Sequence, residues 1–108
     1  MTWTVETLTA TVDAEVGALP ADMRAQLARI SSLIEAFGLE RMREPHVKHL
    51  SGAIWEMRMR GRDGISRALY VAAKGKRVVI VRVFVKKTQK TPSREIDLAM
   101  SRAKEVLP

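Results

Sequence analysis

Residues 77–87 read RVVIVRVFVKK, and this stretch decides the fold that we expect for the chain. The run is rich in β-branched residues and is apolar on both faces for most of its length, which is typical of an interior strand. Its longest apolar part, residues 78–85, is interrupted by Arg82 and is far shorter than the roughly 20 residues that span a membrane. The stretch therefore predicts a buried strand of a sheet, with Lys86 and Lys87 at its end.

Two more β-like runs precede this strand. Residues 53–60 alternate, and residues 65–73 follow after a turn of charged residues and glycine. In the first run we expect one face towards the core, formed by Ala53, Trp55, Met57 and Met59. The opposite, polar face is expected to consist of Ile54, Glu56, Arg58 and Arg60. Trp55 is therefore interpreted as a core residue, whereas Tyr70 of the second run fits either the core or a base-stacking role.

Helical spacing dominates the first forty residues. Residues 3–8 predict a short strand, and a first helix follows that ends near residues 17–19. A second helix begins at Pro20 and ends at Gly38, with one apolar stripe formed by Met23, Leu27, Ile30, Ile34 and Phe37. Residues 39–49 are polar, contain Pro45 and are expected to form a connecting loop.

A last helix begins at Thr91-Pro92, and its expected apolar face consists of Ile96, Met100, Ala103 and Leu107. The order is then β-α-α-β-β-β-α, an α+β fold with a small, largely antiparallel sheet. Residues 1–108 are expected to form a single domain, because the length suits one domain and no repeat divides it.

Charge is distributed unevenly along the chain. Residues 1–40 carry two basic and six acidic side chains, whereas residues 41–108 carry 17 basic and six acidic ones. A basic half of net charge +11 within a total of +7 attracts anions, nucleic acid above all. The alternative is a basic surface that only keeps the protein in solution.

Several kinds of site have no support in the sequence. The chain has no cysteine, which excludes disulfides and thiolate metal sites and fits a reducing cytoplasm. No basic segment followed by an apolar run indicates a signal peptide, so we expect a cytoplasmic protein that does not contact membranes. His46 and His49 lack a clear third ligand, and we therefore predict no metal site.

Four segments carry a resemblance to a known family: PHVKHL at 45–50, IWEMR at 54–58, RALY at 67–70 and, above all, FVKKTQKTP at 84–92 with Glu95-Ile96 after it. With these segments the chain, from about residue 3 to residue 107, resembles the phage-derived, HigB-like branch of the RelE/ParE toxin superfamily. The resemblance implies a RelE-like fold and the toxin of a type II toxin–antitoxin pair. Such a toxin cuts mRNA on the translating ribosome without metal or cofactor, and a helix-turn-helix antitoxin of the HigA type neutralises it.

RelE-like toxins surround the scissile phosphate with basic residues on a concave sheet face, which implies roles for particular residues here. Arg58 and Arg67 match the strand arginines of that family, and Lys86 or Lys87 matches its late basic residue. The chain departs from the family in two respects. Its final helix has no tyrosine, and Ile54 and Glu56 stand near the positions of the two strand lysines, so the acid and the base stay unassigned.

From these observations we predict four catalytic residues: Arg58, Arg67, Lys87 and His49. The two arginines would stabilise the transition state, Lys87 would hold phosphate, and His49 would carry the proton, with His46 and Lys48 as alternatives. The predicted RNA-contacting residues are Lys48, Arg60, Arg82, Lys86, Lys90 and Arg94, and Glu56 is interpreted as an ion-pair partner that orients Arg58 or Arg67. Two other functions stay open: a ParE-like inhibitor of DNA gyrase, and a phage-derived nucleic-acid-binding protein without activity.

Overall fold

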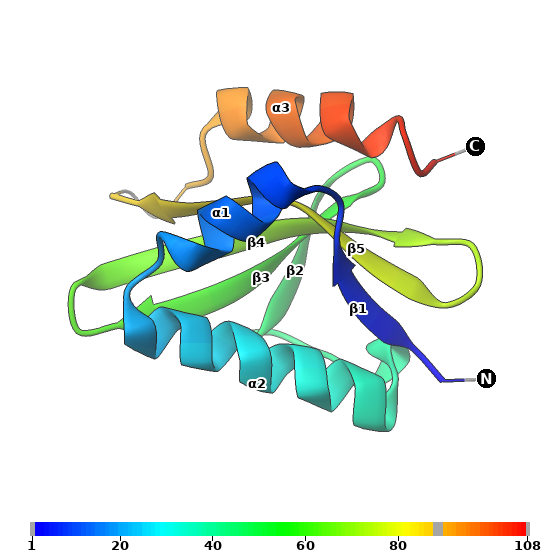
Figure 1. Ribbon diagram of the computed structural model, residues 1–108, viewed down its shortest axis with the longest axis horizontal. Coiled ribbons are helices and arrows are strands. Elements are labelled where there is room, and N and C mark those ends of the chain that lie inside the picture. Colours follow the sequence, from blue (N-terminus) through cyan, green and yellow to red (C-terminus); the bar gives the residue numbers. More distant parts are fainter. Residues whose placement is uncertain (1, 88–89, 108) are drawn as a thin grey trace.

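Helices cover both faces of a five-stranded sheet. The structure, a computed structural model, describes residues 2–87 and 90–107. Its elements are β1 (Thr4–Thr7), α1 (Ala10–Gly17), α2 (Ala21–Phe37), the 3-10 helix η1 (Leu39–Arg41), β2 (Val47–Ser51), β3 (Ile54–Gly61), β4 (Gly64–Ala73), β5 (Arg77–Lys86) and α3 (Ser93–Ala103). In Figure 1, α3 lies on one side of the sheet and α2 on the other, and α1 is drawn in front of the strands between them.

The strands lie in the order β1-β5-β4-β3-β2. β1 runs parallel to β5, and the other neighbours are antiparallel. The expected α+β class and the interior position of residues 77–86 are confirmed. The expected loop at residues 39–49 is wrong, because η1 and the start of β2 occupy it. β2 is a short edge strand with mostly exposed residues, so no apolar alternation marks it in the sequence.

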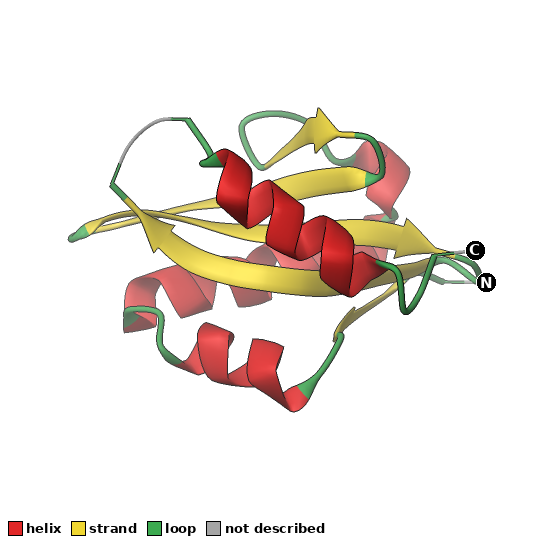
Figure 2. Ribbon diagram, turned by 90° about the horizontal axis from the view of Figure 1, so that it is seen from above, coloured by secondary structure: helices red, strands yellow, loops and turns green. Residues whose placement is uncertain are grey.

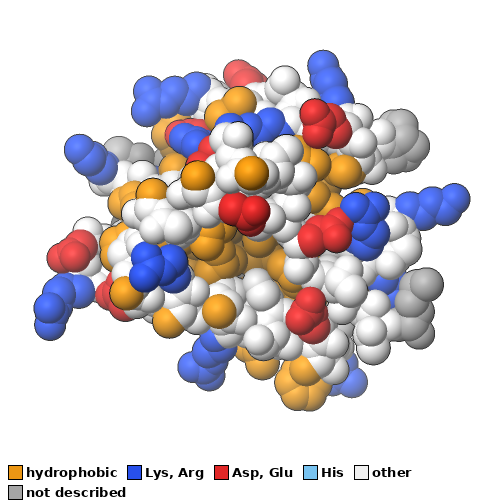
Figure 3. Space-filling model, in the orientation of Figure 1, with side chains coloured by type: hydrophobic (Ala, Val, Ile, Leu, Met, Phe, Trp, Pro, Cys, Tyr) orange, Lys and Arg blue, Asp and Glu red, His pale blue; other side chains and the backbone are white. Residues whose placement is uncertain are grey.

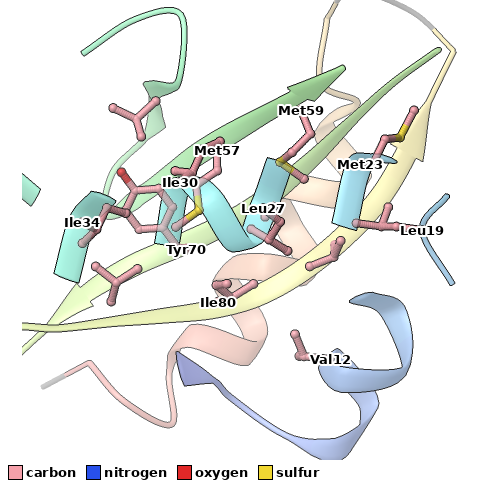
Figure 4. Packing of buried hydrophobic residues seen from close by; sticks show 14 residues of the cluster. Val12, Leu19, Met23, Leu27, Ile30, Ile34, Met57, Met59, Tyr70 and Ile80 are labelled. Carbon is pink, nitrogen blue, oxygen red and sulfur yellow. The ribbon is translucent and has the colours of Figure 1, made fainter. Parts of the chain in front are cut away.

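The larger core lies between the sheet and the two N-terminal helices. The stripe of α2 is buried at Met23, Leu27, Ile30 and Ile34 as expected. Figure 4 shows these side chains packed against Met57, Met59 and Tyr70, which come from the facing strands. Tyr70 is 1% exposed and is thus a core residue, and burial raises the pKa of its hydroxyl. Phe37 is an exception to the expected stripe and is exposed, because it is the last helical residue before the chain turns at Gly38.

The smaller core lies under α3, which Figure 2 shows in front of the strands. The buried residues of α3 are Glu95, Ala99 and Ala103. The expected apolar face is therefore rotated, with Met100 exposed. The rotation has an electrostatic cause, since Oε1 of Glu95 lies 2.7 Å from Nε of Arg82 on β5.

Trp55 is not the core residue that alternation predicts, since it is 39% exposed. It lies near the edge of the sheet, paired with His49 of β2, and the two rings are 5.0 Å apart. An edge strand covers only part of so large a side chain.

Among the described residues, none of the helices combines the length and the hydrophobicity that crossing a bilayer requires.

Glu15 of α1 connects three elements. One carboxylate oxygen accepts from the backbone N–H of Val83 at 3.0 Å, and the other lies 2.8 Å from Nη1 of Arg82 and 2.9 Å from Nη1 of Arg102. These contacts join α1 to the second half of β5 and to α3. They also satisfy an N–H group on a part of β5 that β1 does not pair with.

We expect Glu15→Ala to lower the free energy of unfolding by about 1–3 kcal/mol, because it leaves a partly buried N–H group and part of two guanidinium groups without their acceptor. Urea unfolding followed by circular dichroism measures the change. Asp97→Ala on the exposed side of α3 is the matched control and should change stability by less than about 0.5 kcal/mol. Equal losses in the two variants would show that Glu15 does not join these elements.

Candidate functional site

Net charge alone does not locate a site on this protein. On the side seen in Figure 3, basic side chains are interspersed with acidic ones instead of forming one continuous patch. The distribution of charge within the fold is more informative, because a buried charge needs a partner or a ligand.

One group of charged side chains is gathered on the α3 side of the sheet. Lys48 is the pairing partner of Glu56, and Arg58 is the pairing partner of Arg67, so each pair shares a face of the sheet. The group comes from four neighbouring strands and from the segment before α3. We call it the cationic cluster, and it consists of Lys48, Glu56, Arg58, Arg67, Lys86 and Thr91.

A β-bulge in β5 decides which of its side chains join the cluster. Two consecutive residues of β4, Leu69 and Tyr70, pair with Arg82 and Ile80, so that Val81 is an extra residue in β5. A bulge of this kind reverses the alternation of side chains along the strand.

The reversal brings Lys86 into the cluster in place of Lys87. Val79 lies in the core under α3, and strict alternation from it would direct Lys87 to that face. After the bulge it is Phe84 that packs in this core, and Lys86 follows on the same face. Lys87 comes after the end of β5 and is exposed. The expected strand end at residue 87 is thus one residue too long.

Glu56 is the carboxylate around which the cluster is arranged, and it is 2% exposed. Its Oε1 accepts a hydrogen bond from the Thr91 hydroxyl at 2.8 Å and lies 3.3 Å from Nε of Arg67. Its Oε2 lies 3.5 Å from Nε of Arg58. The expectation that Glu56 pairs with Arg58 or Arg67 is confirmed, and it pairs with both.

Arg67 is more deeply buried than the sequence indicates. The resemblance implies that it contacts the scissile phosphate on a concave sheet face, but it is 2% exposed, and its Nη1 donates to the carbonyl of Ser66 at 3.0 Å. Burial lowers the pKa of its guanidinium, and Glu56 acts in the opposite direction. Arg58 is more accessible, with a quarter of its side chain exposed.

Lys86 lies beside Arg67 and is 5% exposed. Its ammonium donates to the Thr91 hydroxyl at 3.4 Å. Burial lowers the pKa of Lys86, and the charges of Arg67, Arg58 and Lys48 lower it further against the opposing effect of Glu56. The cluster thus holds four basic side chains and one buried carboxylate. Arg67 and Lys86 are buried, whereas Lys48 is exposed, and Arg58 also lies 3.9 Å from a carboxylate oxygen of exposed Glu44.

The other predicted site residues lie elsewhere. Arg82 is held between Glu15 and Glu95, and its hydrogen bond with Glu95 raises its pKa. His49 faces the opposite side of the sheet from Glu56, with Nε2 2.8 Å from the carbonyl of Gly52. The remaining predicted residues are exposed on the surface: His46, Arg60, Lys90 and Arg94. Thr88 and Gln89 of the FVKKTQKTP segment lie outside the described residues.

Thr91 is the member of the cluster that the sequence analysis did not find. Its hydroxyl joins Glu56 to Lys86 and is 6% exposed. The sequence shows only a Thr-Pro pair before a helix, which is a common start signal. Its contacts with β3 and β5 depend on how the segment before α3 crosses the sheet.

Within the part of the chain that the structure describes, no group of three or more His, Asp or Glu side chains is placed to hold a metal ion. The arrangement instead suits an anion, because arginine and lysine donors meet at one place and Glu56 neutralises only part of their charge.

Residues 14–104 match a protein-family model described as "Phage derived protein Gp49-like (DUF891)". No curated protein sequence matches the chain.

We expect the cationic cluster to reduce stability. Lys86→Met should raise the free energy of unfolding by about 0.5–2 kcal/mol, because it removes a buried charge beside Arg67. Glu56→Gln should lower it by about 1–3 kcal/mol, since the buried cations lose their counter-charge. Urea unfolding at pH 7 measures both, and Lys87→Met on the exposed surface is the control for Lys86→Met.

The gain from Lys86→Met should also depend on pH. The pKa of Lys86 is lower in the folded than in the unfolded chain. The loss of stability that the charged Lys86 causes is therefore fully present at pH values below its pKa in the folded chain. It disappears as the pH rises through that value towards the ordinary lysine range. A gain that stays constant up to the lysine range, or a loss of stability at pH 7, would contradict an unfavourable charge at this position.

Proposed function

The chain belongs to the phage-derived Gp49-like family, which lies within the RelE/ParE-like toxin superfamily, and from this premise we propose that it is a ribosome-dependent mRNA endoribonuclease that acts as a toxin. The observation that carries the proposal is the cationic cluster, in which four basic side chains from four strands surround one carboxylate. An excess of positive charge on a sheet attracts a phosphodiester substrate, which is negatively charged, whereas it does not stabilise a folded core. Its inhibitor in the cytoplasm would be a helix-turn-helix antitoxin of the HigA type.

The reaction needs no metal if the RNA supplies the nucleophile. The 2′-oxygen attacks the adjacent phosphorus, the bond to the 5′-oxygen breaks, and the products carry a 2′,3′-cyclic phosphate and a 5′-hydroxyl. Negative charge accumulates on the phosphorane oxygens in between. Cations that are already in place stabilise that charge without reorganisation, which is often the largest contribution to catalysis.

The geometry suggests a division of roles within the cluster. Arg58 is partly exposed and is assigned to the phosphate, with Lys48 beside it at the edge strand. Glu56 is a positioning residue, because its carboxylate is buried and already accepts from Thr91 and pairs with Arg67. Arg67 is buried in the sheet and contributes positive electrostatic potential at the position assigned to the phosphate.

Lys86 is assigned as the general acid. Its lowered pKa makes its ammonium a better proton donor than an ordinary lysine, so it can protonate the departing 5′-oxygen. The proton of the 2′-hydroxyl passes to solvent water at the open side. Lys87 and His49 are assigned no role in the reaction, because Lys87 lies past the end of β5 and His49 faces the other side of the sheet.

Induced expression without an antitoxin should arrest growth, and mapping of mRNA 5′ ends should reveal new ends that carry a 5′-hydroxyl. Arg58→Ala should reduce cleavage by about 10²–10³-fold, the usual cost of one lost transition-state donor. Lys104→Ala, an equal change of charge at an exposed position that caps the end of α3, should cleave like the wild type. Intact mRNA together with gyrase-linked DNA breaks would reject the ribonuclease and favour a ParE-like toxin.

The assignment of Lys86 predicts a pH profile. Because the protonated form is the active one, the cleavage rate should fall as the pH rises through the lowered pKa of Lys86. Lys86→Arg keeps the charge but holds its proton throughout this range, so it should lose about 10²–10⁴-fold in rate and should lack that decline. Single-turnover cleavage of ribosome-bound mRNA at several pH values measures both. An unchanged profile in Lys86→Arg would remove Lys86 from the proton transfer.

A further inference from the structure

A pocket of about 370 Å³ adjoins the cationic cluster. It lies at the edge of β3 that β2 leaves unpaired, between α2 and the segment that leads into β2, and Arg58 and Arg67 connect it to the cluster on the α3 side of the sheet. Four arginines line it, and Arg58 and Arg67 also belong to the cluster, whereas Arg29 of α2 and Arg60 of β3 do not. Ile30, Leu33 and Pro45 add apolar surface, His46 adds an aromatic ring, and none of the described residues that line the pocket is acidic.

The pocket exists because β2 covers only the first half of β3. Their pairing ends at Met57, after which the N–H group of Arg58 donates to the carbonyl of His46 at 2.9 Å. Beyond Met57, side chains of α2 and not a neighbouring strand form hydrogen bonds with the backbone of β3 and of the turn after it. The Gln26 side chain accepts from the N–H group of Arg60 at 2.8 Å and donates to the carbonyl of the same residue.

The same contacts limit what the pocket can bind. Asp22 accepts from the N–H group of Arg62 at 2.7 Å, so α2 satisfies backbone groups of both Arg60 and Arg62. An extended peptide that added a strand here would have to displace Gln26 and Asp22. A ligand in this pocket would therefore not pair with the backbone of β3, and the residues around it are arginines, apolar residues and one histidine.

This combination is the one that a nucleotide requires. Guanidinium groups contact phosphate oxygens, and unpaired bases stack on histidine rings and arginine planes or pack on aliphatic side chains. The volume falls within the range of about 300–1,000 Å³ that is usual for small-ligand pockets. Because Arg58 and Arg67 are common to the pocket and the cluster, a nucleotide in the pocket would adjoin a phosphate held by the cluster.

We propose that this pocket is a nucleotide subsite, which holds the base and the phosphate of the residue next to the scissile phosphodiester. The base packs on Leu33 and Ile30 with His46 beside it, and Arg29 and Arg60 contact the phosphate. The choice of an RNA nucleotide as the ligand rests on the proposed ribonuclease function. The pocket would then contribute to the selection of the cut site, since its contacts depend on the base.

The test uses adenosine 5′-monophosphate and inorganic phosphate as separate probes of the full-length protein. Titration with the nucleotide should shift the ¹³C methyl signals of Ile30 and Leu33, and inorganic phosphate should not. Arg29→Ala should weaken nucleotide binding about tenfold, whereas Lys104→Ala, which removes an exposed positive charge at the end of α3, should stay within about twofold. Leu33→Asn, checked for folding by urea unfolding, should weaken binding of the nucleotide but not of phosphate.

Cleavage assays separate this inference from the proposed function. If wild-type protein binds the nucleotide at Ile30 and Leu33 but cuts no mRNA, the subsite stands and the ribonuclease fails. If mRNA is cut but Arg29→Ala and Leu33→Asn retain nucleotide affinity and cut-site choice, the subsite is wrong and the ribonuclease stands. Equal shifts with phosphate alone, or an Arg29→Ala effect confined to antitoxin binding, would also overturn the subsite.

Discussion

The bulge at Val81 is the constraint on which the rest of the site depends. Before it, β5 presents apolar side chains to α3, and after it the strand presents Arg82, Phe84 and Lys86 to the same side. One extra residue thus changes a strand that closes a core into one that carries cations beside β4 and β3. Bulges are common near functional sites for this reason, because they redirect side chains without interrupting the sheet.

The fold contains two networks of charged side chains, which differ in their balance of acidic and basic groups. One joins α1, β5 and α3 with two acidic and two basic side chains: Glu15, Glu95, Arg82 and Arg102. It is neutral overall and links elements, so its role is structural. The cationic cluster has four basic side chains, which face the buried carboxylate of Glu56 and, beside Arg58, the exposed carboxylate of Glu44, and burial opposes the charge of both Lys86 and Arg67. Among the described side chains of this cluster positive charges outnumber negative ones, and this imbalance is the physical argument for a binding site.

Side chains from the helices also protect the strand edges. Glu35 accepts from the N–H group of Val5 at 3.0 Å on β1, Glu15 does the same for β5, and Gln26 and Asp22 do so for β3. Unpaired strand edges attract other chains, so these contacts limit unwanted pairing. On β3 they have a second effect, since they hold α2 beside the strand and thereby form the wall of the pocket that contains Arg29 and Arg60.

The sequence by itself determined the α+β class, the extent of α2 between Pro20 and Gly38, the basic second part and the pairing of Glu56 with arginine, because these depend on local spacing and composition. It did not reveal β2, whose polar residues lack a periodic pattern, nor the exposure of Trp55 at the sheet edge. It assigned Lys87 to catalysis and Lys86 only to RNA contact, whereas the structure brings Lys86 and not Lys87 into the cluster. The cause is a bulge that exists only in the pairing of β5 with β4 and cannot be detected along one strand. The burial of Arg67 and the contacts of Thr91 likewise come from residues far apart in the chain, so only the tertiary structure decided which cations meet and how much of their charge is left for a ligand.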